Sequence, residues 1–250
     1  MSIYRAMARH YDALTDDVPY GAFADFLEKI FRREKTAPEL ILDLACGTGS
    51  VTKLLAERGY DVIGADSSPD MLMQAANKCS SLPVMPTFIR QSMTDLDLYG
   101  TVDAVVSFLD SVNYLTDPRD LDRAFGRVSL FLNPGGLFVF DLNTACKLSS
   151  IAGNSFVRET GDVFCVWQAA WEEKTRLAAF YLDLFEKKKD GRYLRESEDH
   201  RERAYSVGEI RDVLEKNGME LRRVYGNLKF RAPKPEEERI FFVAKKKARS

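Results

Sequence analysis

The sequence lacks an apolar run long enough for a membrane span or a secretory signal, and residues 1–15 mix charged with apolar side chains. It also lacks an excess of positive charge, since its net charge is −2; a global field that attracts nucleic acid or anionic membrane is therefore absent. Its four cysteines show no C-x-x-C spacing, so we expect reduced thiols and no metal site. These absences predict a cytoplasmic protein and disfavour nucleic acid and membranes as partners.

What the sequence does contain is the composition of a globular protein. Its 250 residues are 45% hydrophobic and 30% charged, enough for one large domain or one and a half ordinary ones. Up to Asn143, five apolar strand patterns alternate with helical patterns, which predicts a doubly wound, Rossmann-like α/β sheet. The fourth strand, Val102 to Phe108, is a nearly continuous apolar run, as expected of a strand buried on both faces.

Residues 40–50 join an apolar strand, a glycine turn and the start of a helix. Gly47 and Gly49 lack a Cβ, so the backbone there can adopt positive φ and let a ligand approach closely. The following helix, about Ser50 to Arg58, directs its N-terminal amides to the same place. A second strand ends on Asp66, whose carboxylate can accept both hydroxyls of a ribose. The stretch predicts a site for a nucleoside cofactor.

A nicotinamide dinucleotide would suit the same arrangement. Its G-x-G-x-x-G fingerprint requires a third glycine for close helix packing, and Thr52 stands at that place, which weakens this alternative without removing it. The combination of Asp43 at the head of D-L-A-C-G-T-G-S with Asp66 behind it is more specific. It resembles the motif of class I S-adenosylmethionine-dependent methyltransferases.

Beyond Asn143 the pattern changes to an antiparallel one. Three strands are expected at 162–172, 176–188 and 192–204, with Asp190-Gly191 as a hairpin turn. A capping box at Ser206 to Glu209 then opens another helix, and strands at 221–225 and 239–244 complete the main sheet as a hairpin. We therefore expect a cofactor-binding core of residues 1–144 and 205–250, interrupted by an antiparallel insert, 145–204, that forms a substrate lid.

The whole layout resembles a bacterial group of these methyltransferases that carries such an insert and is related to glycine and amino-sugar N-methyltransferases. The matching stretches are 8–12, 43–49, Asp66, 111–115, 140–144 and 200–205. The resemblance implies a seven-stranded sheet, S-adenosylmethionine as cofactor, and transfer of its methyl group to a nitrogen or oxygen of a small molecule. RNA or protein methylation, a nicotinamide-dependent oxidoreductase and an inactive cofactor-binding module remain alternatives, and monomer and homodimer are both open.

The resemblance also implies the cofactor contacts. Gly47 and Gly49 would lie against the methionine part, Asp66 would bind the ribose, Met71 and Met93 would flank the adenine, and Tyr11 and Leu109 would close over the cofactor. One departure stands at Ser92, where the family usually has an acid that holds the adenine amino group; a serine can still accept a hydrogen bond, but without charge. The residues expected to bind the cofactor are Tyr11, Asp43, Ala45, Gly47, Gly49, Asp66, Ser67, Met71, Ser92, Met93 and Leu109.

Positioning of the two reactants can supply about 7–11 kcal/mol of barrier lowering, so a general base is not obligatory. A hydroxyl acceptor would still need one, and the candidates are His200, Asp110 and, as a weaker candidate, Tyr114. The first two candidates each also have an interpretation without catalysis: His200 would form a salt bridge, and Asp110 would only accept hydrogen bonds. Aromatic residues of the insert would serve equally as an acceptor wall or as core. The residues expected to contact the acceptor are Tyr20, Asn113, Tyr114 and Trp167.

Overall fold

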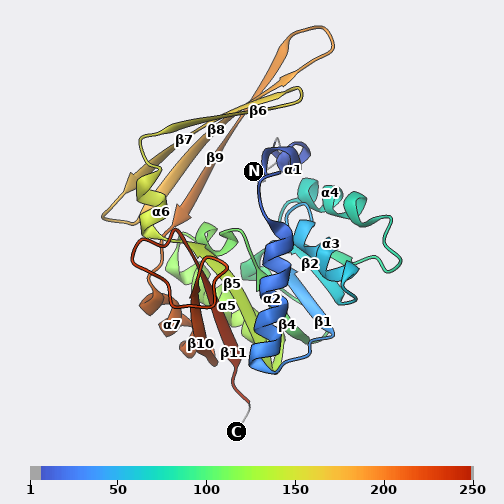
Figure 1. The fold of residues 1–250 in the computed structure, drawn as a ribbon, viewed down its shortest axis with the longest axis vertical. Helices are drawn as coiled ribbons and strands as arrows, with labels where there is room; N and C mark the ends of the chain where they lie inside the picture. Colours follow the sequence, from blue (N-terminus) through green and yellow to red (C-terminus); the bar gives the residue numbers. More distant parts are fainter. Residues whose placement is uncertain (1–6, 249–250) are drawn as a thin grey trace.

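The structure is a computed structural model that describes residues 7–248 (Figure 1). Its larger sheet, sheet A, has seven strands in the order β10-β11-β5-β4-β1-β2-β3. The strands, in chain order, are β1 (Leu40–Leu44), β2 (Asp61–Asp66), β3 (Thr87–Arg90), β4 (Val102–Ser107), β5 (Leu132–Asn143), β10 (Met219–Gly226) and β11 (Arg239–Lys246). Strand β11 runs antiparallel to both of its neighbours, whereas the pairs among β1 to β5 are parallel.

Helices connect these strands and cover the sheet. They are α1 (Tyr11–Leu14), α2 (Tyr20–Glu34), α3 (Ser50–Glu57), α4 (Pro69–Cys79), α5 (Pro118–Phe131), α6 (Ala145–Ser150) and α7 (Val207–Lys216), with the 3-10 turns η1 (Met7–Arg9), η2 (Met93–Asp95) and η3 (Ser111–Tyr114). Local sequence determines several of their starts. Ser68, Asp117 and Ser206 each accept a hydrogen bond from a first-turn amide, and Ser206 forms the expected capping box with Glu209.

The core of sheet A has two sides because successive side chains on a strand point to opposite faces. On one side Phe138 and Phe140 of β5 pack with Phe242 of β11 and Phe125 of α5, all almost fully buried. On the other side the neighbouring strand residues pack against α2 and α3. Helices on both faces explain why the strands read as continuous apolar runs.

The chain turns in opposite directions from β1. It passes to β2 and β3 on one side and later returns to β4 and β5 on the other, so β1 lies between β2 and β4. In open parallel sheets this switch point, at the carboxyl ends of the strands, is where ligands bind. The fold thereby places the glycine turn after β1, Asp66 at the end of β2 and the residues after β4 around one edge.

A second, four-stranded antiparallel sheet, sheet B, follows β5. Its strands are β6 (Ser155–Thr160), β7 (Val163–Glu172), β8 (Leu177–Lys187) and β9 (Tyr193–Arg203), in sequence order across the sheet. Figure 1 shows this sheet, yellow to orange, extending beyond sheet A on the side where α1 lies. Arg158 of β6 forms ion pairs with Asp16 and Asp17, which follow α1.

The expected α/β sheet with an antiparallel insert is confirmed, and two details differ. Strand β6 was not predicted, because its residues alternate between half-buried and exposed and lack a strong apolar signal. Strand β5 begins at Leu132 and so includes the Asn133 to Gly136 segment, whose turn-forming residues do not predict a strand. There Val102 pairs with Leu132 and Ala104 with Leu137, so 133–136 bulge out of the pairing. Within residues 7–248, no helix is long and apolar enough to span a membrane.

Candidate active site

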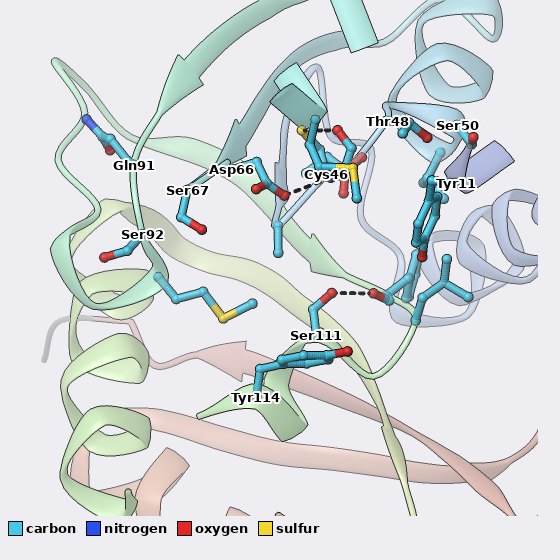
Figure 2. Close-up of a pocket in the computed structure, with 18 of the residues that line it drawn as sticks. Tyr11, Cys46, Thr48, Ser50, Asp66, Ser67, Gln91, Ser92, Ser111 and Tyr114 are labelled. Carbon is cyan, nitrogen blue, oxygen red and sulfur yellow. Dashed lines mark hydrogen bonds between the residues drawn. The ribbon is translucent and has the colours of Figure 1, made fainter. Parts of the chain in front are cut away.

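A pocket opens at the switch point of sheet A, and its walls come from the glycine turn, the ends of β2 and β3, the segment after β4, and the N-terminal helices. Figure 2 shows Ser67 and Ser92 on one side of this pocket, Tyr11 on the opposite side, and Ser111 and Tyr114 along a third wall. Residues far apart in the sequence therefore share one concave site, as expected for the ligand site of an open α/β sheet.

The glycine turn is shaped for a close ligand. Gly47 has φ 55° and Gly49 has φ 75°, the left-handed region that favours glycine. The two glycines serve different purposes. A Cβ on Gly47 would meet nothing within 4 Å, whereas a Cβ on Gly49 would lie 2.8 Å from the Cβ of Ala75. Gly47 thus keeps a pocket wall open, and Gly49 permits tight packing of α3 against α4.

Two carboxylates support this turn. Asp66 accepts hydrogen bonds from the amides of Gly47 (2.9 Å) and Ser68 (2.8 Å), so it fixes the turn and the start of α4 together. Burial raises the pKa of Asp66, although these amides act in the opposite direction. Asp43 accepts a 2.6 Å hydrogen bond from Thr52, and burial raises the pKa of Asp43 to about 6. Thr52, where a dinucleotide site would have its third glycine, therefore ties α3 to β1.

The segment after β4 makes a strained turn. Leu109 (φ 58°) and Asp110 (φ 55°) are consecutive non-glycine residues in the left-handed region, a conformation that costs free energy and concentrates at functional sites. Leu109 lines the pocket. Asp110 pairs instead with Arg239 at 2.7 Å, and its amide donates to the buried Asp141. The turn therefore directs neighbouring side chains to a pocket wall and to an ion-pair cluster.

The N-terminal segment covers the pocket. Tyr11 and Tyr20 line it, and the Tyr20 hydroxyl lies 3.1 Å from that of Thr15. Asp12 is held by Lys78 of α4 (2.8 Å) and by Thr48 (2.6 Å) of the glycine turn. Lys78 also donates to Ser50 at 2.6 Å. This network fastens the segment that carries Tyr11 over the glycine turn.

Most residues expected at the cofactor do meet in this pocket. Those on its wall are Tyr11, Asp43, Ala45, Asp66, Ser67, Met71, Ser92, Met93 and Leu109, together with Gly47 and the expected acceptor contacts Tyr20 and Tyr114. Gly49 lies behind the wall. Ser92 donates to Asp95 at 2.8 Å, which leaves lone pairs of its oxygen for another donor.

Besides Gly49, four expected residues lie off the pocket wall. Asn113 is fully buried and bonds the backbone of Asn143 and Arg203, and Trp167 stacks on Phe156 with ring centroids 4.1 Å apart. His200 is buried with Glu198 at 3.2 Å, and its ring lies 6.0 Å from the ring of Tyr114. Asp110, the fourth, is in the ion pair with Arg239. The catalytic assignments of His200 and Asp110 stay predictions.

Sequence reasoning missed the partners of Asp110. Arg239 binds Asp141 with one guanidinium nitrogen and Asp110 with the other, and Glu202 of β9 lies beside them. The only available signal was the position of Asp141 near the carboxyl end of a buried strand. Arg239 and Glu202 come from strands that sequence patterns cannot place next to β4 and β5.

The sheet has a Rossmann-like order with β11 reversed, and acidic and glycine residues line the pocket at its switch point, as is typical of nucleotide-binding α/β folds. Residues 41–136 match the family model described as a methyltransferase domain. The chain is 33% identical over 98% of its length to YqeM of Bacillus subtilis (strain 168), a provisionally named methyltransferase of which it covers 97%. The structure matches an S-adenosylmethionine-dependent methyltransferase from Clostridium acetobutylicum ATCC 824 with TM-score 0.87 and 30% identity, covering 98% of this chain and 99% of that one.

A glycine/sarcosine N-methyltransferase of Parasynechococcus marenigrum (strain WH8102) is 32% identical over 50% of this chain and 45% of its own length. The chain belongs to the S-adenosylmethionine-dependent methyltransferases, so its cofactor is S-adenosylmethionine.

Proposed function

We propose that the protein transfers the methyl group of S-adenosylmethionine to a nitrogen or oxygen nucleophile of a small molecule. The observation that carries this proposal is the segment that covers part of the pocket. Tyr11, Tyr20 and Tyr114 line the pocket, and the segment that bears Tyr11 is held over the glycine turn by the hydrogen bonds of Asp12 with Thr48 and Lys78. A pocket covered in this way favours an acceptor small enough to enter it over a folded RNA or protein.

The wall residues fit the cofactor. The open space at Gly47 suits the methionine part, the carboxylate of Asp66 at the end of β2 suits the ribose, and Met71 and Met93 offer apolar faces for adenine. The oxygen of Ser92, oriented by its bond to Asp95, would accept from the adenine amino group. When bound, S-adenosylmethionine supplies a methyl group on a positively charged sulfur.

The chain then has to align the acceptor and exclude water. Alignment can contribute about 7–11 kcal/mol in well-oriented systems. Residues 145–204, which contain sheet B, would act as the substrate lid of a core formed by 1–144 and 205–250, because Glu198, His200 and Glu202 on one face of β9 are turned towards the core. The name of the glycine/sarcosine N-methyltransferase relative supports a small acceptor.

The test uses S-adenosylmethionine with a labelled methyl group and three separate pools: a cell extract filtered to small molecules, total RNA and total protein. We expect label in the small-molecule pool, dependent on protein and lost with Asp66→Ala, whose removal frees the Gly47 amide. Transfer of label to RNA or protein alone, at physiological salt, would replace the proposal with macromolecular methylation.

A further inference from the structure

Asp110, Asp141, Glu202 and Arg239 form a cluster of buried and partly buried charges that the cofactor site leaves unused. Three acids surround one guanidinium, so the cluster carries an excess of negative charge when its acids are ionised. Among the residues described, no group of three or more His, Cys, Asp and Glu could hold a metal ion. Arg239 occupies the centre instead, bound to Asp110 and Asp141.

The cluster adjoins the pocket. Leu109 and Ser111, on either side of Asp110, both line the pocket. Tyr11 is close enough to Asp110 for its charge to raise the pKa of the tyrosine hydroxyl, after the larger effect of burial. The side chains of Asp110 and Arg239 are 19% and 20% exposed, so a ligand can reach this ion pair.

The cluster also has hydrogen-bond capacity that the protein does not use. Asp141 is fully buried, and its Oδ1 has no hydrogen-bond partner in residues 7–248, which is costly for a carboxylate oxygen. Glu202 is 4% exposed and accepts from Asn143 through Oε2 at 3.0 Å. An ammonium group offers three N–H donors and a positive charge, which is the complement of these oxygens.

Hydrogen bonds to the neighbouring backbone hold Glu202 in place. Asn113 donates to the carbonyl oxygens of Asn143 in β5 and Arg203 in β9, and thereby fixes the residue next to Glu202 against sheet A. Burial raises the pKa of Glu202 well above its ordinary value, and the charge of Asp110 adds to the rise. A carboxyl group held in this position can exchange a proton with a ligand bound at the cluster.

We propose that this cluster is the acceptor subsite, that it selects an amine arriving as a cation, and that Glu202 takes the proton that the amine must lose. The inference rests on the proposed function and narrows its acceptor to nitrogen. The ammonium transfers one proton to the Glu202 carboxylate and becomes a neutral amine. Its lone pair then forms the N–C bond to the methyl carbon while the C–S bond breaks, and that electron pair stays on sulfur. The products are the methylated ammonium and a neutral thioether.

The first test needs no variant. Sinefungin carries a primary amine on carbon where the cofactor carries its methyl group on sulfur, and S-adenosylhomocysteine has neither. We expect sinefungin to bind at least about tenfold more tightly at pH 7. Because a neighbouring cation favours the ionised form of Glu202, sinefungin binding should release protons at every pH at which this carboxyl group is protonated in the free enzyme, and calorimetry in two buffers of different ionisation enthalpy measures that release. Equal affinities, or binding without proton release, would overturn the proposal.

The second test uses Glu202→Gln, which keeps an oxygen for Asn143, and the control Asp199→Asn, an exposed acid on the other face of β9. The titratable and charged groups that influence Glu202 are Asp110, Asp141 and Arg239, with His200 on its own strand. Glu202→Gln should abolish the proton release and the preference for sinefungin while S-adenosylhomocysteine affinity stays within about twofold. Asp199→Asn should change neither, and retention of both signatures in Glu202→Gln would exclude Glu202 as the proton acceptor.

These outcomes separate the inference from the proposed function. Label found only in RNA or protein would refute the small acceptor whatever sinefungin does. Label found in a small alcohol or phenol, with no proton release on sinefungin binding, would retain the proposed function and refute the amine subsite.

Discussion

Sheet A and sheet B differ in how many of their faces are covered by other parts of the protein. Sheet A is covered by helices on both sides, and strands such as β4 are buried along almost their whole length. Sheet B packs through one face only: on β8, Phe180 and Leu184 are buried while Tyr181, between them, is 51% exposed. The comparison teaches that the packing of sheet A also sets the position of the cofactor site, whereas sheet B presents one row of buried or partly buried side chains, Glu198, His200 and Glu202, to the rest of the protein.

The largest expected effect distinguishes two glycines that both have a positive φ. Gly49 beside sheet A and Gly191 at a hairpin tip of sheet B both have positive φ, but only at Gly49 would a Cβ clash, with Ala75. Gly49→Ala should lower the free energy of unfolding by about 3 kcal/mol, from backbone strain plus overpacking. Gly191→Ala should cost about 1 kcal/mol, from strain alone.

Chemical denaturation followed by circular dichroism measures both losses. Calorimetry should show weaker S-adenosylmethionine binding for Gly49→Ala only. Equal losses of stability in the two variants would mean that the packing of α3 against α4 is not the constraint that distinguishes the sheets.

The second prediction compares two acids whose pKa values move in opposite directions. Burial raises the pKa of Asp43 in β1 from 3.8 to about 6, so the folded state binds this proton more tightly than the unfolded state. Its contribution to stability is therefore present below about pH 4 and lost as pH rises to about 6, a change of about 3 kcal/mol. Asp43→Asn should become more stable relative to the wild type over that interval.

In sheet B, Ser197 and then Arg195 lower the pKa of the exposed Asp183. Its contribution is present above the ordinary pKa of an aspartate and lost as pH falls, so Asp183→Asn should become less stable relative to the wild type as pH rises. Urea unfolding of the three proteins between pH 3 and 8 gives both slopes. The same slope in both variants would show that the two carboxyl groups do not differ in environment.

The smallest expected effect concerns the N-terminal segment, whose acidic side chains contact both the sheet A part and sheet B. Lys78 holds Asp12 on the sheet A side through a partly buried network, and Arg158 holds Asp16 and Asp17 on the sheet B side at the surface. Lys78→Met should speed dissociation of S-adenosylhomocysteine about fivefold, and Arg158→Met about twofold or less, because exposed ion pairs contribute little. Stopped-flow displacement measures both rates. A larger effect for Arg158→Met would mean that the ion pairs with sheet B hold the N-terminal segment more strongly than Lys78 does.

The cofactor half of the site could be predicted from the sequence because its signals are local. Gly47, Asp66 at the end of β2 and the Ser68 cap of α4 lie in one continuous stretch from β1 to the start of α4, and each residue type suits the backbone geometry of its own segment. Gly49 shows the limit of this reasoning, because its role is packing against Ala75 of another helix.

The acceptor half could not be predicted in the same way. The association of Glu202 with Asp110 depends on β9 docking against sheet A through Asn113, which no residue spacing reports. Asn113 is polar, as a substrate contact would be, but its side-chain amide donates its hydrogen bonds to backbone carbonyl groups. Trp167 likewise stacks on Phe156, which belongs to β6, the strand that sequence patterns did not show.

Arg239 has a consequence for how such enzymes can diversify. It is the first residue of β11 and follows the surface loop 227–238, while the cofactor wall is built from the first half of the chain. In the proposed subsite, a change in that loop would move the guanidinium, and with it the charge presented to an acceptor, while the glycine turn and Asp66 stay untouched. The reversed strand would thereby let acceptor preference evolve separately from cofactor binding.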